Sequence, residues 1–249
     1  MIPALEVRNL SKEYHGNLAV KDVSYSLAAD TVVALVGPNG AGKTTCFNML
    51  HGQVRQDRGE ILLGGQHIGM FSPRERLKLG IARTFQITET FLSMSVIENV
   101  QIAILAFKGE LMSGFRSLGK RYFDDAAYIL ELVGLIHLMD RECTKLAYGD
   151  LKRVEFAIAL ASRPRILLLD EPTAGMSTKE RYAIMDAVVK IAREFHNTIL
   201  FTEHDMDVVF RHAERILVMD QGALIADGSP EAVRADSYVQ KVYFGSGEF

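Results

Sequence analysis

The chain has 249 residues, 48% of them hydrophobic, which is enough for one domain with a substantial core. Its 28 lysines and arginines against 31 aspartates and glutamates give a net charge of −3, which excludes the overall basic field of a nucleic-acid-binding protein. No apolar run reaches the roughly 18 residues of a membrane-spanning helix, and the first residues lack the pattern of a secretory signal. Two distant cysteines, Cys46 and Cys143, predict neither a disulfide framework nor a zinc site. We therefore expect a soluble cytoplasmic protein that binds no nucleic acid and reaches a membrane only through a partner.

The first part of the chain is predicted to form β-strands. The segments "LEVRNL" and "AVKDVSYSL", within residues 5–27, are rich in β-branched and apolar residues and are bounded by turn residues. The run "TVVALV" at 31–36 is almost continuously apolar, which is typical of a strand buried on both faces. Because the same pattern returns at 165–170, 198–203 and 215–220, we expect an α/β protein with a largely parallel sheet.

The apolar strand runs directly into "GPNGAGKTT", which matches the pattern G-x-x-x-x-G-K-[ST]. Its position after a buried strand and before a helix-like stretch indicates a phosphate-binding loop rather than a chance glycine-rich turn. The backbone N–H groups of such a loop and the helix N-terminus hold the α- and β-phosphates of a nucleotide. Lys43 is expected to reach the β- and γ-phosphates, and the Thr44 hydroxyl to bind Mg²⁺.

A serine followed three positions later by a glutamate marks three helix starts, at Ser72, Ser95 and Ser177. Between about residue 88 and residue 163 no buried strand pattern appears, and we expect a helical insert there. Three large apolar residues just before Ser95 cannot all be covered by the helix that begins there: Phe91, Leu92 and Met94. They form either an apolar rim for a partner or a contact with the insert's own core.

The stretch "LAYGDLKRVEFAIALASRP" at 146–164 predicts a turn that opens an amphipathic helix. Val154, Ile158 and Ala161 lie on one side of that helix, and the charged residues lie largely on another: Lys152, Arg153 and Glu155. The turn is either an ordinary helix start or a second place where N–H groups bind a phosphate.

The run "ILLLDEP" ends a predicted strand with two carboxylates. Asp170 is placed to hold Mg²⁺ directly or through water, and Glu171 to polarise an attacking water. Taken alone, such a pair is also typical of a helix cap or of a solvated surface. After a phosphate loop, the pair indicates hydrolysis rather than transfer to a substrate hydroxyl.

The base of the nucleotide is expected to be adenine, because the chain contains no N-K-x-D sequence of the kind that reads guanine. Tyr14 lies on a predicted turn upstream of the loop and can stack on an adenine ring. Phe47 is the competing aromatic residue, and a core position for Tyr14 is the third possibility.

The order of these motifs resembles the ATP-binding cassette family along essentially the whole chain: Tyr14, the phosphate loop, Gln86 in "RTFQ", the signature-like "LAYGD", "ILLLDEP", "TAGMS" with Ser177, and His204 in "TEHD". The resemblance implies a P-loop NTPase core with a mostly parallel sheet, an N-terminal antiparallel β-subdomain and a helical subdomain. It implies one domain over 1–249, with the core in 1–87 and 164–249 and the helical subdomain in 88–163. The nucleotide-binding residues that it implies are Tyr14, Gly37, Pro38, Asn39, Gly40, Ala41, Gly42, Lys43, Thr44, Thr45, Leu146, Ala147, Tyr148, Gly149, Asp150 and Ser177.

The resemblance also implies roles in ATP hydrolysis. Glu171 would be the catalytic base, and His204, which alone would more often be a solvated histidine, would contact the γ-phosphate. Gln86 would join the Mg²⁺ and water site to the helical subdomain, so that the metal ligands are Thr44, Gln86 and Asp170. Ser177 would lie in the loop that crosses between two subunits, because in this family each ATP lies between two cassettes.

Two positions depart from the common family pattern. The usual L-S-G-G-Q is here Leu146-Ala147-Tyr148-Gly149-Asp150, so the serine hydroxyl is absent, and Ser177 stands where many members carry aspartate. Both departures, with the tail "GSPEAVRADSYVQKVYFGSG", resemble the ATPase subunits of branched-chain amino acid importers. Cassettes for urea, amides or carboxylates and for lipopolysaccharide export share much of this pattern.

The expected partners are therefore a second cassette, identical or not, transmembrane permease subunits and, indirectly, a periplasmic or extracellular solute-binding protein. The expected location is the cytoplasmic face of the inner membrane. A soluble cassette of repair or translation is disfavoured, because the chain has no heptad run and one cassette only. A small-molecule phosphoryl transferase is disfavoured by Glu171 and the signature-like turn.

Overall fold

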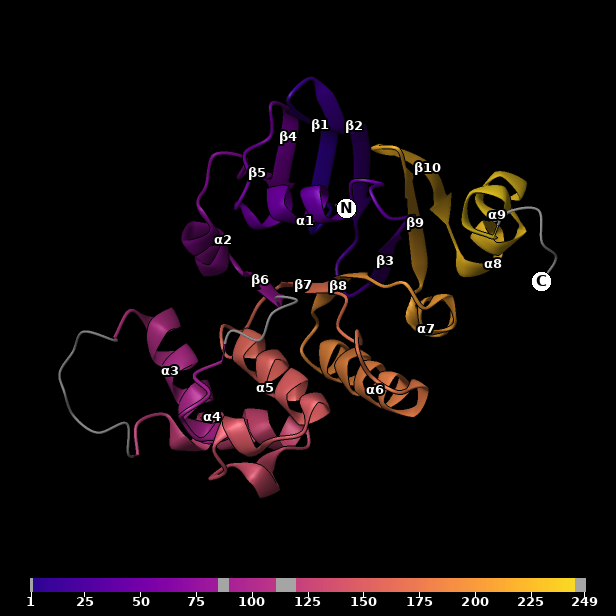
Figure 1. Ribbon diagram of the computed structural model, residues 1–249. Coiled ribbons are helices and arrows are strands. Elements are labelled where there is room, and N and C mark those ends of the chain that lie inside the picture. The colour runs from indigo at the N-terminus through magenta and orange to yellow at the C-terminus, as the bar shows by residue number, and fades with distance from the viewer. Residues whose placement is uncertain (1, 85–89, 111–119, 245–249) are drawn as a thin grey trace.

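The computed structural model describes residues 2–84, 90–110 and 120–244 of the chain (Figure 1). Within these ranges no helix is both long enough and apolar enough to cross a lipid bilayer.

The strands of the described residues form two sheets. The first is antiparallel and has the order β2-β1-β4-β5, with β1 (Leu5–Tyr14), β2 (Asn17–Leu27), β4 (Arg58–Leu63) and β5 (Gln66–His67). The second has the order β10-β9-β3-β8-β7-β6, with β3 (Val32–Val36), β6 (Ile81–Thr84), β7 (Ile166–Asp170), β8 (Thr198–Thr202), β9 (Arg215–Asp220) and β10 (Ala223–Gly228). Its neighbours pair in parallel except β10, which runs antiparallel to β9. The predicted α/β fold, with an antiparallel N-terminal sheet and a mostly parallel core sheet, is thus confirmed.

The helices of the described residues are α1 (Lys43–His51), α2 (Pro73–Leu79), α3 (Val96–Lys108), α4 (Phe123–Leu132), α5 (Tyr148–Leu160), α6 (Thr178–Glu194), α7 (Met206–His212), α8 (Pro230–Ala235) and α9 (Ser237–Phe244), with 3₁₀ turns at Ile136–Leu138 and Cys143–Lys145. The three predicted starts are confirmed, because Ser72, Ser95 and Ser177 each precede a helix directly. Each donates its backbone N–H to the glutamate three positions later, at 2.8–2.9 Å. These reciprocal caps satisfy donors that the helix itself leaves unpaired.

The short strands of the second sheet are apolar throughout because they separate two cores. Every residue of β3, β7 and β8 is buried. Since side chains alternate along a strand, Val33 and Leu35 of β3 face a core that includes α1 and the antiparallel sheet. Val32, Ala34 and Val36 face the core that the other helices build. Helix α1 consequently lies between the two sheets (Figure 1).

Helices α3, α4 and α5 form a helical lobe below the second sheet in Figure 1, between β6 and β7 in the sequence. Within it, α3 packs against both α4 and α5. The sequence analysis placed Lys152 and Glu155 on another side of α5 than its apolar residues, but it did not predict their burial: both are buried, and Lys152 Nζ lies 2.9 Å from Glu155 Oε2. Two opposite charges three positions apart share one helix face, and their pairing allows both to be buried together.

Phe91 and Leu92 remain largely exposed in the segment before α3, at 56% and 47% of their surfaces. Asn99 holds this segment in place, because its side chain accepts a hydrogen bond from Phe91 N at 2.8 Å and donates one to Phe91 O at 3.1 Å. The two apolar side chains are therefore presented outward by a segment that is itself anchored.

A fully buried arginine joins α2 to the end of α1. Arg76 donates from Nη1 to the carbonyls of Met49 and Leu50, the latter at 2.7 Å. Its Nε and Nη2 donate to the carbonyls of Phe71 and Gly69 at 3.0 and 3.1 Å. Burial lowers the pKa of Arg76 to about 10. The C-terminal carbonyls of α1, which carry partial negative charge, thus find their donors in a cation of another helix.

We expect Arg76→Met to lower the free energy of unfolding by roughly 2–4 kcal/mol, because the substitution leaves buried carbonyls without donors. The exposed Arg74→Met on the same helix is the matched control and should change it by no more than about 0.5 kcal/mol. Urea unfolding followed by circular dichroism measures both. Equal effects of the two substitutions would contradict the structural role of Arg76.

Candidate functional site

The predicted phosphate loop connects β3 to α1 and packs tightly on neighbouring backbone. A Cβ atom at Gly37 would lie 2.2 Å from the carbonyl oxygen of Met219 in β9. At Gly42, where φ is 99°, a Cβ atom would lie 2.3 Å from the carbonyl oxygen of Ala19 in β2. Only glycine fits both positions, and its lack of a side chain allows the loop to pack directly on β9 and β2. Asn39 and Gly40, between the two glycines, remain exposed.

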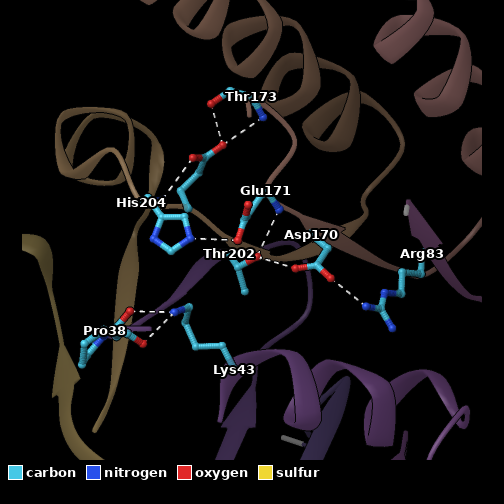
Figure 2. Close-up of polar contacts among 10 residues, drawn as sticks. Pro38, Lys43, Arg83, Asp170, Glu171, Thr173, Thr202 and His204 are labelled. Atoms are coloured by element: carbon cyan, nitrogen blue, oxygen red, sulfur yellow. Dashed lines mark hydrogen bonds and ion pairs between the residues drawn. The ribbon is translucent and has the colours of Figure 1, made fainter. Parts of the chain in front are cut away.

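The ammonium group of Lys43 lies inside the curve of this loop. Its Nζ donates to the carbonyls of Gly37 at 2.6 Å and Pro38 at 3.1 Å (Figure 2). Burial lowers the pKa of Lys43, and the charges of Glu171 and Asp170 act in the opposite direction. Beside Lys43, the predicted metal ligand Thr44 is exposed at the first turn of α1, and Thr45 is half-buried.

Asp170 ends β7 directly opposite Thr202 of β8 in the parallel register. The Thr202 hydroxyl donates to Asp170 Oδ1 at 2.9 Å, and Arg83 Nη2 of β6 lies 2.7 Å from Asp170 Oδ2 (Figure 2). Arg83 Nη1 also donates to Asn48 Oδ1 of α1 at 2.7 Å. The ion pair is almost completely buried, with 5% and 4% of the two side chains exposed. Contacts at or next to the Asp170 carboxylate therefore join the strands β6, β7 and β8 to helix α1.

Glu171 and His204 face each other across the ends of β7 and β8 (Figure 2). His204 Nε2 lies 2.8 Å from Glu171 Oε1. The backbone of Glu171 has φ 48°, a left-handed conformation that is uncommon for a residue with a side chain. Its N–H group is held by Thr202, through the carbonyl oxygen at 3.2 Å and the hydroxyl at 3.1 Å. The strained backbone directs the carboxylate toward His204 rather than along the strand.

Glu203 is a buried carboxylate that the sequence analysis did not single out, and it bonds to the backbone on both sides of the Glu171–His204 pair. Glu203 Oε1 accepts hydrogen bonds from Thr173 N at 2.9 Å and Thr173 Oγ1 at 2.6 Å, and Oε2 accepts from His204 N at 3.2 Å. Burial raises the pKa of Glu203, while the bonds from Thr173 and His204 act against that rise. Glu203 thus ties the segment after Glu171 to the backbone of His204.

The signature-like turn and the loop before Ser177 lie next to each other. Ala147 precedes α5 as its N-cap residue and offers no side-chain hydrogen bond. The first N–H groups of a helix have no acceptor within the helix, and here the side chain of the cap residue supplies none, although the Ala147 carbonyl accepts from Asp150 N at 3.0 Å. The Tyr148 ring packs against Gly175, where a Cβ atom would lie 3.3 Å from Tyr148 Cε1. The Ser177 hydroxyl donates to Glu180 Oε2 at 2.6 Å.

The two aromatic candidates for stacking on a base differ in burial. Phe47 is fully buried in the core around α1, so its ring has no face available to a ligand. Tyr14 is 41% exposed at the end of β1, with Lys12 Nζ 5.5 Å from its ring centre. Tyr14 therefore stays as the predicted stacking residue. Gln86, the remaining predicted site residue, lies outside the described residues.

The donor set fits Mg²⁺ bound together with phosphates. Thr44 offers a hydroxyl, and Asp170 offers a carboxylate whose two partners leave further lone pairs. Among the described residues no group of three or more His, Cys, Asp or Glu side chains forms a cage for a metal. Mg²⁺ commonly binds through one or two protein oxygens and the phosphates of a nucleotide, so this sparse set is suitable.

Comparison with known proteins gives a consistent result. The family described as "ABC transporter" matches residues 20–174. The chain is 39% identical to the high-affinity branched-chain amino acid transport ATP-binding protein LivG of Escherichia coli K12, and 38% identical to BraF of Pseudomonas aeruginosa. Each match covers 98% of this chain and 98% of the relative. The lipopolysaccharide export system ATP-binding protein LptB of Haemophilus influenzae is 35% identical, over 97% of both chains.

Solved structures show the same architecture. The ADP conformation of MJ1267, an ATP-binding cassette of an ABC transporter, superposes with a TM-score of 0.87 at 28% identity, over 99% of this chain and 100% of that one. A dimeric post-hydrolysis state of the cassette MJ0796, bound to ADP and Pi, gives a TM-score of 0.77 at 25% identity, over 91% and 98%.

The left-handed backbone at Glu171 leads to a paired prediction. Glu171→Gly and Glu171→Ala both remove the contact with His204, but only glycine adopts φ 48° without strain. We expect the glycine variant to be more stable than the alanine variant by about 1 kcal/mol. Urea unfolding of the two proteins tests this, and an alanine variant of equal or greater stability would show that the conformation stores no strain.

Proposed function

The chain belongs to the ABC transporter family of ATPases, and from this premise we propose that it is the ATP-binding and ATP-hydrolysing subunit of an importer for branched-chain or other hydrophobic amino acids. One observation carries the proposal for the site. The phosphate loop, Asp170, Glu171 and His204 all lie at the carboxyl ends of the neighbouring strands β3, β7 and β8, where α/β sheets bind ligands. The proposed class of transported solute is supported by LivG and BraF, which are ATP-binding proteins of branched-chain amino acid transport.

We assign the following roles in ATP binding and hydrolysis to residues of this chain. The loop at 37–45 holds the phosphates, with the Lys43 ammonium moving from loop carbonyls to phosphate oxygens, and Tyr14 stacks on the adenine. Thr44, Asp170 and Gln86 hold Mg²⁺, which when bound neutralises phosphate charge. Glu171 accepts a proton from the attacking water, and His204 orients that carboxylate and contacts the γ-phosphate.

The second half of the site is proposed to come from another cassette. The turn Leu146–Asp150 of one subunit, with Ser177, would face the nucleotide of the other. Because Ala147 has no hydroxyl, the donors in this turn are the backbone N–H groups at the start of α5. The dimeric structure of MJ0796 with ADP and Pi supports the pairing of two cassettes. The cassettes close around ATP and separate after hydrolysis.

The remaining partners follow from the proposed transport role. We place the chain peripherally on the cytoplasmic face of the inner membrane, bound to transmembrane permease subunits and, through them, to a periplasmic or extracellular solute-binding protein. Residues 88–163 are proposed as the helical subdomain that contacts the permease, and 1–87 with 164–249 as the core. Phe91 and Leu92, exposed before α3, are the proposed contact for a permease helix, and Gln86 its link to the Mg²⁺ site.

One alternative has support of its own. The identity to LptB favours lipopolysaccharide export as the second candidate. Cassettes for urea, amides or carboxylates remain a third group, on the motif pattern alone. A soluble cassette without a permease is the least favoured. Co-purification of the untagged chain from its native membrane separates these alternatives, since it identifies the permease and the partner cassette together. Recovery with an amino acid permease supports the proposal, and recovery with no membrane protein overturns it.

Glu171→Gln is expected to retain ATP binding and lose steady-state hydrolysis by about 10²–10⁴-fold, because the amide keeps the shape of the side chain but cannot accept the proton. Lys43→Ala should instead weaken nucleotide binding, because it removes the ammonium that lies in the loop. Nucleotide binding and phosphate release are measured on both variants. Unchanged turnover of Glu171→Gln would remove Glu171 from its assigned role.

The exposed apolar pair before α3 is expected to be needed for coupling. Phe91→Asp or Leu92→Asp should abolish solute uptake by the reconstituted transporter while leaving the melting temperature and basal ATPase of the isolated chain intact, because both side chains are exposed. Tyr238→Asp, which changes an exposed aromatic residue on α9, is the matched control and should retain uptake. If melting temperature and basal hydrolysis fell together with uptake, these side chains would belong to the lobe's own core.

A further inference from the structure

Tyr14, the residue assigned above to stack on the adenine, lies at the tip of a two-stranded hairpin. It is the last residue of β1 and is followed by a turn at His15 and Gly16, which both have positive φ, 51° and 85°. The neighbouring strand β4 accompanies β1 only as far as Ser11, which is paired with Arg58. An isolated pair of strands is only marginally stable in water. The tip of this hairpin therefore needs a further contact to hold the Tyr14 ring in one position.

Asp57, the residue before β4, supplies such a contact. Its N–H group donates to the carbonyl of Ser11 at 3.0 Å, and its Oδ2 accepts from the backbone N–H of Glu13 at 2.8 Å. Its Oδ1 accepts from Lys12 Nζ at 2.7 Å. The hydrogen bonds from Lys12 and Glu13 hold the pKa of Asp57 below its usual value, so the carboxylate is charged at neutral pH. The Asp57 side chain thus takes the place of a strand beside the end of β1.

The position of Asp57 depends on how β4 begins. Gly59, two residues later, has φ 87°, and a Cβ atom there would lie 2.4 Å from the carbonyl oxygen of Arg8 in β1. Only glycine allows the start of β4 to approach β1 so closely. On the other edge of the hairpin, Ala19 of β2 packs on Gly42 of the phosphate loop. The hairpin is therefore held by the phosphate loop on one edge and by Asp57 on the other.

The Lys12 ammonium connects the Asp57 carboxylate to the ring itself. Lys12 Nζ lies 2.7 Å from Asp57 Oδ1 and 5.5 Å from the centre of the Tyr14 ring. The Lys12 side chain is 16% exposed, whereas that of Asp57 is 46% exposed. A cation at this distance is attracted to the π-electrons of the ring, and the carboxylate limits where the cation can lie. Asp57 thus acts on Tyr14 through both the backbone and the side chain of the residues that precede it.

We propose that Asp57 is a positioning residue for recognition of the adenine base, which holds Glu13 and Lys12 so that the Tyr14 ring is presented to the nucleotide. The inference rests on the stacking role proposed for Tyr14. Because an exposed ion pair contributes little to folding stability, the effect of Asp57 is expected on affinity for the base rather than on the fold.

The test compares ATP with inorganic tripolyphosphate, which carries the phosphates without a base. Dissociation constants of both are measured on the full chain by titration calorimetry without Mg²⁺, which prevents hydrolysis. Asp57→Ala should weaken ATP binding about three- to tenfold, a part of the stacking free energy, and leave tripolyphosphate binding unchanged. Asp57→Asn, which keeps an acceptor for the Glu13 N–H, should bind ATP more tightly than Asp57→Ala.

Glu60→Gln is the matched control. It changes another exposed carboxylate of β4, which lies 3.8 Å from Arg8 of β1, and it should alter neither dissociation constant. The melting temperatures report whether each variant is folded. The proposal is overturned if Asp57→Ala binds ATP as tightly as the unchanged chain, or if Asp57→Ala weakens ATP and tripolyphosphate equally.

A double-mutant cycle with Tyr14 separates this proposal from the stacking role on which it rests. Tyr14→Ala should weaken ATP binding by about tenfold or more, and adding Asp57→Ala should cause no further loss, because the ring that Asp57 positions is gone. An undiminished effect of Asp57→Ala in the absence of the ring would refute the positioning role alone. If Tyr14→Ala bound ATP with unchanged affinity, the stacking role would fail and the positioning role with it.

Discussion

The parallel pairing of β7 with β8, which sets Asp170 opposite Thr202, is the constraint on which the rest of the site depends. Through that register one threonine contacts both acidic residues: its hydroxyl donates to the Asp170 carboxylate and accepts from the backbone N–H of Glu171. A shift of one residue would turn the Thr202 side chain to the other face of the sheet and remove both contacts. Both strands are buried on both faces, so the close packing of their side chains in the two cores, rather than an apolar–polar pattern, opposes such a shift.

Charge balance is the second condition of the site. Asp170 is paired with Arg83, and the ammonium of Lys43 lies in the field of both carboxylates. Arg83 also reaches Asn48 on α1, so the helix that begins at the loop is joined to the carboxylate at the end of β7. A buried carboxylate needs such a partner, because without one its charged form would be strongly disfavoured. The loop and the carboxylate therefore hold each other in place.

The sequence predicted the helices and strands whose formation depends on neighbouring residues along the chain. The buried strands were visible as continuous apolar runs, and the capping boxes at Ser72, Ser95 and Ser177 marked three helix starts. The segments β4, β5, β6 and β10 were not predicted individually, because they are short or carry polar residues at the edges of the sheets. Arg76, Arg83 and Glu203 were missed, because the partners that allow a charge to be buried come from tertiary contacts. The choice of Tyr14 over Phe47 likewise needed burial, which a single sequence does not contain.

The central strand of the second sheet has a consequence for biosynthesis. Val33 of β3 pairs with Leu200 on one side and Arg215 on the other, so both neighbours of β3 are translated long after it. The antiparallel sheet, by contrast, is complete by His67. As the chain leaves the ribosome, the first sheet can form early, whereas an entirely apolar strand waits for partners in the last quarter of the chain. Until β9 emerges, β3 has open edges of the kind that invite aggregation, which makes the nascent chain a substrate for chaperones.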